Sequence, residues 1–245
     1  MTVQKQKTRE QIQQLHQYKA SGNQAAFNKI LFEFMPHFRK VIHHKIRQME
    51  LRGLLPKNMY SAQGIVDEVY LRLYHETAGV PLDENYLKAR LFYVAKKVLD
   101  EIREKECGKR PDITTEELIN RELLALEEKY TVDGEGRLVL LEDLDDISYH
   151  QEEYGENLIL IEEEKIDEVA RTMALKGDEE PLTEAERKRL GKAYSDLPET
   201  SRMVIDYLAF GKLNEEQVAS VLDTNIESIT RMIEKVKRRF RSVLG

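Results

Sequence analysis

Residues 213–241 read LNEEQVASVLDTNIESITRMIEKVKRRFR, and their pattern is typical of a helix-turn-helix. Asn214 and Gln217 have the spacing of a capping box, which predicts where the first helix begins. The turn falls at Asp223, because aspartate is one of the few non-glycine residues that tolerate a left-handed backbone. Asn225 can then cap a second helix. We therefore expect two helices joined by a tight turn at this end of the chain.

The second helix of this stretch is expected to bury one side and to carry cations on the others. Its apolar residues recur at helical spacing and should face the core: Ile226, Ile229, Ile233, Val236 and Phe240. A cationic helix behind a brace helix suits the major groove of DNA, because clustered lysine and arginine release counterions on binding. A helical hairpin whose basic face is only solvated is the alternative. The candidate DNA-binding residues are Asn225, Ser228, Thr230, Arg231, Lys235, Lys237, Arg238 and Arg239, of which Thr230, Arg231 and Lys235 should contact bases and the last three phosphates.

Composition narrows the class of protein. A chain of 245 residues with 41% hydrophobic content can form one large or two small domains. We find no apolar run of membrane-spanning length and no signal-peptide pattern, so we expect a cytoplasmic protein without membrane insertion. Cys107 is the single cysteine, which excludes an internal disulfide. Strand patterns are scarce, and an all-α fold is the expectation.

The charge is segregated along the chain. Residues 111–181 contain 23 acidic and 6 basic residues, whereas residues 1–110 contain 12 and 20, and residues 182–245 contain 10 and 12. This asymmetry predicts two helical domains, 1–110 and 182–245, joined by a long acidic linker. The linker has patterns of local structure: a capping box at Thr114–Glu117, a hairpin over 130–141 with its turn at Asp133–Gly134, and an amphipathic stretch over 158–173. A linker that is simply solvated is the alternative.

Two further helices are expected in the N-terminal domain. One begins at Ser61 and reads SAQGIVDEVYLRLYHE, and the next reads ENYLKARLFYVAKKVLDEIREKECGKRP. Leu87, Leu91, Val94, Val98 and Ile102 form the expected buried set of the second helix. Its other faces combine aromatic and basic residues, a combination that can stack and hold unpaired bases, and Tyr86, Phe92 and Tyr93 lie close to the cations. The candidate contacts on this helix are Tyr86, Lys88, Lys96, Lys97 and Arg103.

These segments resemble a known family. SAQGIVDEVYLRLY followed by ARLFYVAKKVLDEIR looks like domain two of bacterial sigma factors of the extracytoplasmic-function type. LPETSRMVIDYLAFGKLNEEQVASVLDTNIESITRMIEKVKRRFRSVL resembles domain four of the same family, in the family's order along the chain. The resemblance implies a factor that binds core RNA polymerase, reads the upstream promoter element with the helix-turn-helix, and holds the downstream element as it melts. It places polymerase docking on Asp67, Glu68, Leu71 and Arg72.

Several positions depart from the family pattern and bear on which promoter base is read. Gly64 follows Gln63 where the family has an acidic pair, Arg90 replaces a tryptophan, Lys97 replaces an asparagine, and Asp223 replaces the turn glycine. In the family the linker passes through the active cleft and RNA exit channel of the polymerase. The acidic linker of this chain could serve that role or fold back onto the basic DNA-reading faces.

Two other classes of protein are weighed against this one. A stand-alone helix-turn-helix regulator would bind duplex DNA without polymerase, and an interaction protein would use its basic and acidic segments only on each other. The resemblance also admits an anti-sigma factor as a partner. The chain has no phosphate-binding glycine loop, nucleophile elbow or metal-ligand spacing, so we expect no enzyme, metal, cofactor or small-molecule substrate.

Overall fold

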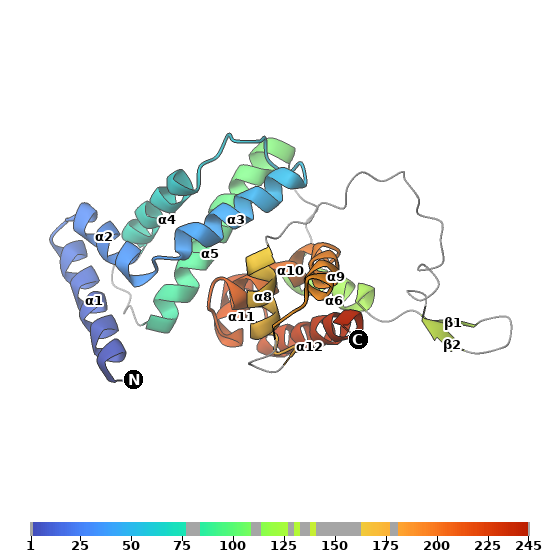
Figure 1. Ribbon diagram of the computed structural model, residues 1–245. Helices are drawn as coiled ribbons and strands as arrows, with labels where there is room; N and C mark the ends of the chain where they lie inside the picture. Colours follow the sequence, from blue (N-terminus) through green and yellow to red (C-terminus); the bar gives the residue numbers. More distant parts are fainter. Residues whose placement is uncertain are drawn as a thin grey trace. The chain divides into compact units, whose positions relative to one another are not determined.

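The computed structural model describes residues 2–76, 84–108, 114–126, 130–132, 138–140, 163–176 and 181–244. The fold is helical, which confirms the all-α expectation (Figure 1). One antiparallel pair of short strands, β1 (Tyr130–Val132) and β2 (Leu138–Leu140), interrupts it, with Tyr130 opposite Leu140. The predicted hairpin is therefore confirmed, while its expected turn at 133–134 lies outside the described residues.

The chain forms two compact units. Unit 1 comprises Met1–Thr115 and Met203–Thr230, and unit 2 comprises Glu116–Arg202 and Arg231–Gly245. The boundaries of these units differ from the domain boundaries predicted from the charge pattern. The first helix of the helix-turn-helix clusters with the N-terminal helices, and helices of the acidic segment cluster with the C-terminal ones.

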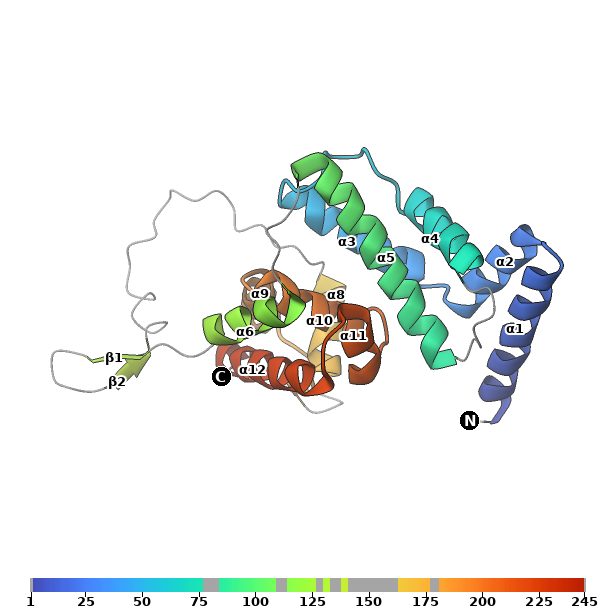
Figure 2. The same cartoon turned by 180° about the vertical axis from the view of Figure 1, so that it is seen from behind.

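Unit 1 begins with five helices. Their bounds are α1 (Thr2–Ala20), α2 (Gln24–Phe34), α3 (Phe38–Leu51), α4 (Ala62–Glu76) and α5 (Glu84–Cys107). Pro36 falls between α2 and α3, where a ring without an N–H donor interrupts helical hydrogen bonding. The hydroxyl of Ser61 accepts a hydrogen bond from Gly64 N at 3.0 Å and caps α4 as expected. Helices α3, α4 and α5 lie side by side in both views (Figures 1 and 2).

The core of unit 1 is built on α5. Leu87, Leu91, Val94 and Val98 are buried as predicted, while Ile102 is half-buried. Phe92, which the sequence placed near the basic surface, is also fully buried. Its ring meets Phe38 edge-on at 5.2 Å between centroids and Tyr207 at 5.4 Å. An aromatic ring covered on both sides in this way packs the core and is not available to a base.

Two helices from the C-terminal part of the sequence complete unit 1. Helix α10 (Glu199–Ala209), from residue 203 onward, and helix α11 (Glu215–Leu222) belong to it, and α11 packs on α5. Gly211 lies where the end of α10 comes close to α5. A Cβ atom at this position would lie 2.6 Å from the carbonyl oxygen of Tyr207 and 3.1 Å from Cζ of Phe92, so only glycine fits.

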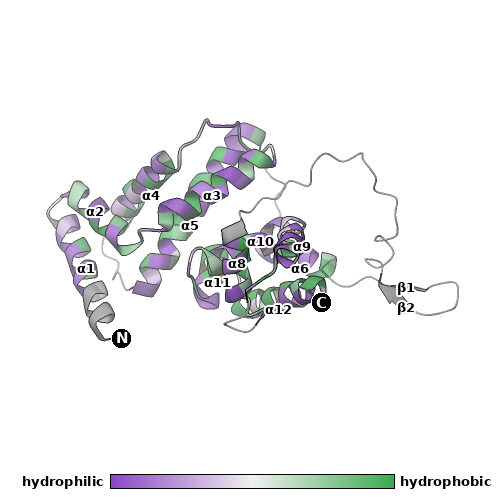
Figure 3. Cartoon of the chain, in the orientation of Figure 1, coloured by the Kyte–Doolittle hydropathy of each residue, from purple (hydrophilic) through white to green (hydrophobic). Residues whose placement is uncertain are grey.

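Unit 2 contains the described helices of the acidic segment. They are α6 (Thr115–Ala125) and α8 (Glu163–Thr172), and they join α9 (Glu184–Ser195) and most of α12 (Ile226–Leu244). Thr183 and Glu186 form a capping box at the start of α9. Polar and apolar residues alternate around these helices (Figure 3), and the buried residues of unit 2 include Ile119, Leu123, Ile166, Val169, Leu190, Tyr194, Val236 and Phe240. Of the helices described, none combines the length and apolar character needed to cross a membrane.

Candidate nucleic-acid interface

The local hydrogen bonds of the helix-turn-helix are those that the sequence predicts. Asn214 Oδ1 accepts from Gln217 N at 2.8 Å, and Gln217 Oε1 accepts from Asn214 N at 2.9 Å, which confirms the capping box. Asp223 ends α11 in a left-handed conformation with φ 53° and ψ 52°. Asn225 Oδ1 accepts from Ser228 N at 2.8 Å and caps α12. The turn therefore presents the first residues of α12 as a helix-turn-helix requires.

The buried side of α12 differs from the predicted stripe. Ile229, Val236 and Phe240 are buried as expected, and Met232, which the prediction missed, is buried with them. Ile226 is 41% exposed, and Ile233 is half-buried. The buried residues recur every three or four positions, and Ile226 stands roughly 80° around the helix from their centre. The first turn of α12 therefore carries an apolar side chain at the surface.

Some of the candidate DNA contacts on α12 are accessible, and others are covered or already hydrogen-bonded. Arg231 and Arg238 are exposed, and Lys237 and Arg239 are half-buried. The hydroxyl of Ser228 is covered, because the residue is 1% exposed, so its expected contact with DNA does not fit the structure. The ammonium of Lys235 donates to the carbonyl oxygen of Leu123 at 2.8 Å. Its expected base contact would require that bond to break.

Two polar side chains at the start of α12 also make hydrogen bonds within the protein. Asn225 is exposed, and its side-chain oxygen serves as the helix cap. Thr230 is half-buried and donates a hydrogen bond through Oγ1 to Oε2 of Glu215 in α11. The bond to Glu215 holds the Thr230 hydroxyl in one orientation.

One face of α5 combines aromatic and cationic groups. It is formed by Tyr86, Arg90, Tyr93 and Lys97, and we call it the α5 face. The spacing of these positions places them on one side of the helix. Its two middle members, Arg90 and Tyr93, are half-buried, and Arg90 donates to Oε2 of Glu76 at 2.5 Å. Lys97 Nζ lies 4.7 Å from the centroid of the Tyr93 ring, and Arg90 Cζ lies 4.8 Å from it. Tyr86 is 36% exposed and Lys97 is exposed. The spacing 86, 90, 93, 97 is visible in the sequence, but the predicted DNA contacts did not include Arg90 and Tyr93.

The other candidates on α5 lie on a different side of the helix. Arg103 is only 8% exposed, so its expected contact with DNA does not fit the structure. Lys96 donates to Asp100 at 2.8 Å and Lys88 to Glu84 at 2.6 Å, and both lysines are half-buried. The side chain of Gln217 on α11 donates to Asn85 Oδ1 at 3.3 Å, so α11 lies against the N-terminal end of α5 on this side.

The expected polymerase-docking residues on α4 are only partly exposed. Asp67 is exposed, while Glu68, Leu71 and Arg72 are half-buried. The guanidinium of Arg72 donates to both oxygens of Glu101, each at 2.7 Å, and to Glu68 at 2.6 Å. These bonds raise the pKa of Arg72, and the guanidinium lowers the pKa of Glu101. Arg72 therefore links α4 to α5 through its ion pair with Glu101. Asp67 is the exposed acidic residue among the four expected docking residues.

A buried ion pair, which the sequence analysis missed, lies elsewhere in unit 1. Lys45 Nζ on α3 donates to Oδ2 of Asp206 on α10 at 2.5 Å. The Asp206 side chain is 0% exposed and that of Lys45 is 14% exposed. His44 Nε2 lies 3.9 Å from the other carboxylate oxygen, and burial raises the pKa of the adjacent Tyr207. The one signal in the sequence is an aspartate within the otherwise apolar run VIDYLAF.

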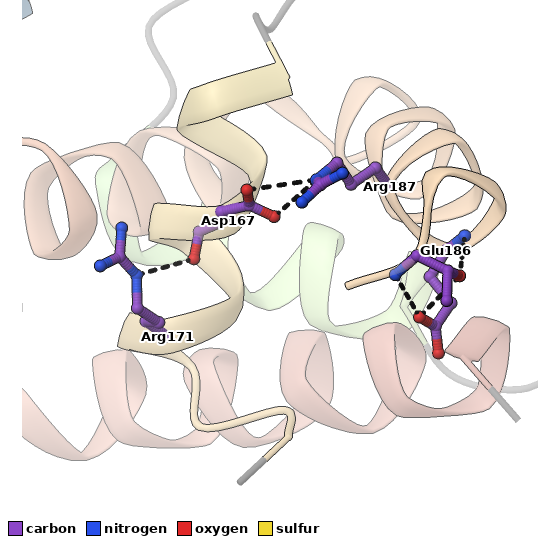
Figure 4. A network of polar contacts seen from close by, with 5 residues as sticks. Asp167, Arg171, Glu186 and Arg187 are labelled. Carbon is purple, nitrogen blue, oxygen red and sulfur yellow. Dashed lines mark hydrogen bonds and ion pairs between the residues drawn. The ribbon is translucent and has the colours of Figure 1, made fainter. Parts of the chain in front are cut away.

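In unit 2, polar contacts hold the acidic segment in place. Glu122 on α6 accepts hydrogen bonds from Thr200 N, Ser201 N and the Ser201 hydroxyl at 2.7–2.8 Å and so caps the start of α10. Figure 4 shows Asp167 of α8 facing Arg187 of α9, with 2.9 Å between Oδ1 and Nε. Helices α6 and α8 are therefore packed and bonded, which does not fit a fully solvated linker, whereas residues 141–162 lie outside the described part.

A second polar group in unit 2 surrounds the capping box of α9. The bond from Lys176 at 2.7 Å and those from Thr183 lower the pKa of Glu186 to about 2. Among the described residues, no group of three or more histidine, cysteine, aspartate or glutamate side chains could hold a metal ion. Comparison with protein-family models, with curated proteins and with solved structures finds no match to this chain.

Proposed function

We propose that this chain is a sigma factor of the extracytoplasmic-function type, which binds core RNA polymerase and directs it to promoters. In this proposal α12 reads the upstream promoter element in the major groove, and the α5 face holds the downstream element as it melts. The polymerase docks on the surface of α4 around Asp67. The proposal combines the resemblance of the two sequence segments with the geometry of these surfaces.

The α5 face is the observation that carries the proposal. A base that leaves the double helix loses its stacking, and an exposed tyrosine ring offers a replacement worth about 1–3 kcal/mol per base. Tyr86 is exposed at one end of the face, and Tyr93 holds Arg90 and Lys97 close to its ring. Lys97, the exposed cation of the face, attracts the phosphates beside an extruded base, whereas Arg90 is paired with Glu76 at 2.5 Å. A regulator that binds only duplex DNA has no use for such a face.

The helix-turn-helix supplies the second part of the argument. Ile226 and Glu227 in the first turn of α12 are exposed, and so are Arg231 and Arg238 farther along the helix. Recognition helices contact base edges mainly through their first turns, while cations farther along hold phosphates. Duplex reading by α12 and single-strand capture by α5 together are what opening of a promoter requires.

The first test is co-elution of the purified full chain with sigma-free core RNA polymerase on a sizing column at moderate salt. We expect a one-to-one complex. Absence of a complex, together with tight duplex binding by the free chain, would favour the stand-alone regulator. Absence of both would leave the interaction protein as the better interpretation.

The second test separates capture of unpaired bases from general attraction to DNA. The complex is titrated with a forked DNA that has a single-stranded downstream element and with the corresponding full duplex. We expect Lys97→Ala to weaken binding of the fork more than binding of the duplex. Lys105→Ala is the matched control, because it removes the same charge from an exposed position on another side of α5. Equal effects of the two substitutions would remove the α5 face from the proposal.

A further inference from the structure

The first turn of α12 presents an apolar side chain where polar ones are usual. The exposed large hydrophobic residues among those described are Phe32, Met59, Tyr86, Leu124 and Ile226, and of these only Ile226 lies on α12. Its chain neighbours Asn225 and Glu227 are exposed and polar. One apolar side chain among polar neighbours is too small a surface for a protein partner. A single exposed isoleucine side chain can instead contact one methyl group or a similarly small apolar feature of a partner.

The next turn of the helix carries a hydroxyl with a defined hydrogen-bond direction. Thr230 follows Ile226 by four residues, so the two side chains are neighbours on the helix surface. The Thr230 hydroxyl donates its proton to Oε2 of Glu215. A hydroxyl has one proton and two lone pairs, so once the proton is committed the oxygen can only accept. Glu215 therefore decides which kind of group the Thr230 oxygen can meet.

We propose that these three residues give α12 a chemical preference in the major groove: Ile226 contacts the 5-methyl group of a thymine, and the Thr230 oxygen accepts from the amino group of a neighbouring adenine or cytosine. Glu215 acts through Thr230 as a positioning residue. The 5-methyl of thymine is the apolar feature of the major groove, and adenine N6 and cytosine N4 are its amino donors. The inference rests on the proposed function, because it requires α12 to read duplex DNA, and it names the bases that α12 prefers.

The test of Ile226 begins with the preferred DNA sequence of the complex between the full chain and core polymerase, selected from randomised duplexes. Each thymine of the upstream element is then replaced by uracil, which removes the methyl group and leaves every hydrogen bond of the base. We expect one such replacement to weaken binding roughly fourfold, the factor that corresponds to one buried methyl group. Ile226→Ala should lose the same factor on the thymine DNA and should no longer distinguish thymine from uracil, whereas Ile226→Val should still distinguish them.

Leu124→Ala is the matched control, because Leu124 is another exposed apolar residue and lies on α6. It should keep the full distinction between thymine and uracil. A distinction that persists in Ile226→Ala would overturn the assignment of Ile226, and so would the absence of any uracil-sensitive position.

The test of Thr230 uses the same duplexes with single amino groups removed. Replacing the contacted adenine by purine deletes its N6 amino group and should weaken wild-type binding but not that of Thr230→Val. Glu215→Ala removes the acceptor and frees the Thr230 proton. We expect that variant to accept a base with a carbonyl acceptor as well as one with an amino donor, a change that mere loss of helix packing would not produce. An unchanged base preference in Glu215→Ala would overturn the positioning role.

The failures of the two proposals are distinguishable. If the complex or the free chain shows no sequence preference for any duplex, the proposed function fails and this inference fails with it. If a preference exists but does not depend on Ile226 or Thr230, only this inference fails.

Discussion

Replacing Lys45 by methionine would test how the buried charge of unit 1 is balanced. Methionine keeps most of the length and the apolar stem of lysine but removes the ammonium group. Asp206, whose carboxylate lies 2.5 Å from that ammonium, is 0% exposed and would remain buried without its cation. Removing one partner of a buried ion pair costs about 3–5 kcal/mol, because the remaining charge stays desolvated. We therefore expect Lys45→Met to destabilise unit 1 by that amount.

The opposite substitution should cost less, because the two partners are not equally buried. Asp206→Asn keeps an oxygen that can accept from Lys45, and the Lys45 side chain is 14% exposed, so its ammonium can reach water along a flexible stem. We expect a loss of about 1–2 kcal/mol, the scale of a weakened hydrogen bond. The double variant Lys45→Met with Asp206→Leu removes both charges and should be more stable than Lys45→Met alone.

The measurement should report on unit 1 alone. Native-state hydrogen exchange of the backbone amides of α3 and α10 gives the free energy of opening of these helices. Lys40→Met is the matched control, because Lys40 is exposed on the same helix, and we expect it to change little. A loss below about 1 kcal/mol for Lys45→Met, or a larger loss for Asp206→Asn than for Lys45→Met, would refute the reasoning that a buried carboxylate depends on this ammonium.

Three further predictions concern unit 2 and α12. Glu122→Ala should lower the free energy of unfolding by about 1–2 kcal/mol, because the start of α10 loses its cap, and Glu122→Gln should lower it less; urea unfolding measures both. The pKa of Glu186 is lowered from 4.5 to about 2, so its contribution to stability is present above pH 4.5 and disappears as the pH falls toward 2. Glu186→Gln should therefore lower the melting temperature at neutral pH and converge with wild type near pH 2. Lys237→Ala should reduce the slope of log affinity against log salt by about one unit, whereas substitution of the exposed Lys188 on α9, Lys188→Ala, should leave it unchanged.

Much of the local structure could be predicted from the chain alone. The capping boxes at Asn214 and Thr183, the left-handed turn at Asp223 and the break at Pro36 all occur where the sequence places them. Each depends on hydrogen bonds or backbone angles within about one helical turn. Residues that are close in the sequence are close in space in any helix, so these features do not depend on the rest of the fold.

Whether a given side chain is buried or exposed was not predictable in the same way. Ile226 fits the apolar periodicity of α12 and is nevertheless exposed, and Phe92 lies beside basic residues and is buried. Periodicity identifies an apolar side of a helix, but it does not say how far along the helix another element covers that side. Coverage is a property of the packed structure.

Local patterns in the chain were therefore enough to predict the class of fold, the helix-turn-helix and the ends of its helices. The packing of distant helices was needed to show that Lys235 is bonded to the carbonyl of Leu123, that Lys45 neutralises Asp206, and that Tyr86 and Lys97 remain at the surface. The partners in these bonds are more than a hundred residues apart. A charge has the same appearance in a sequence whether it is solvated, paired or buried, because its environment is set by helices that the chain brings together only on folding.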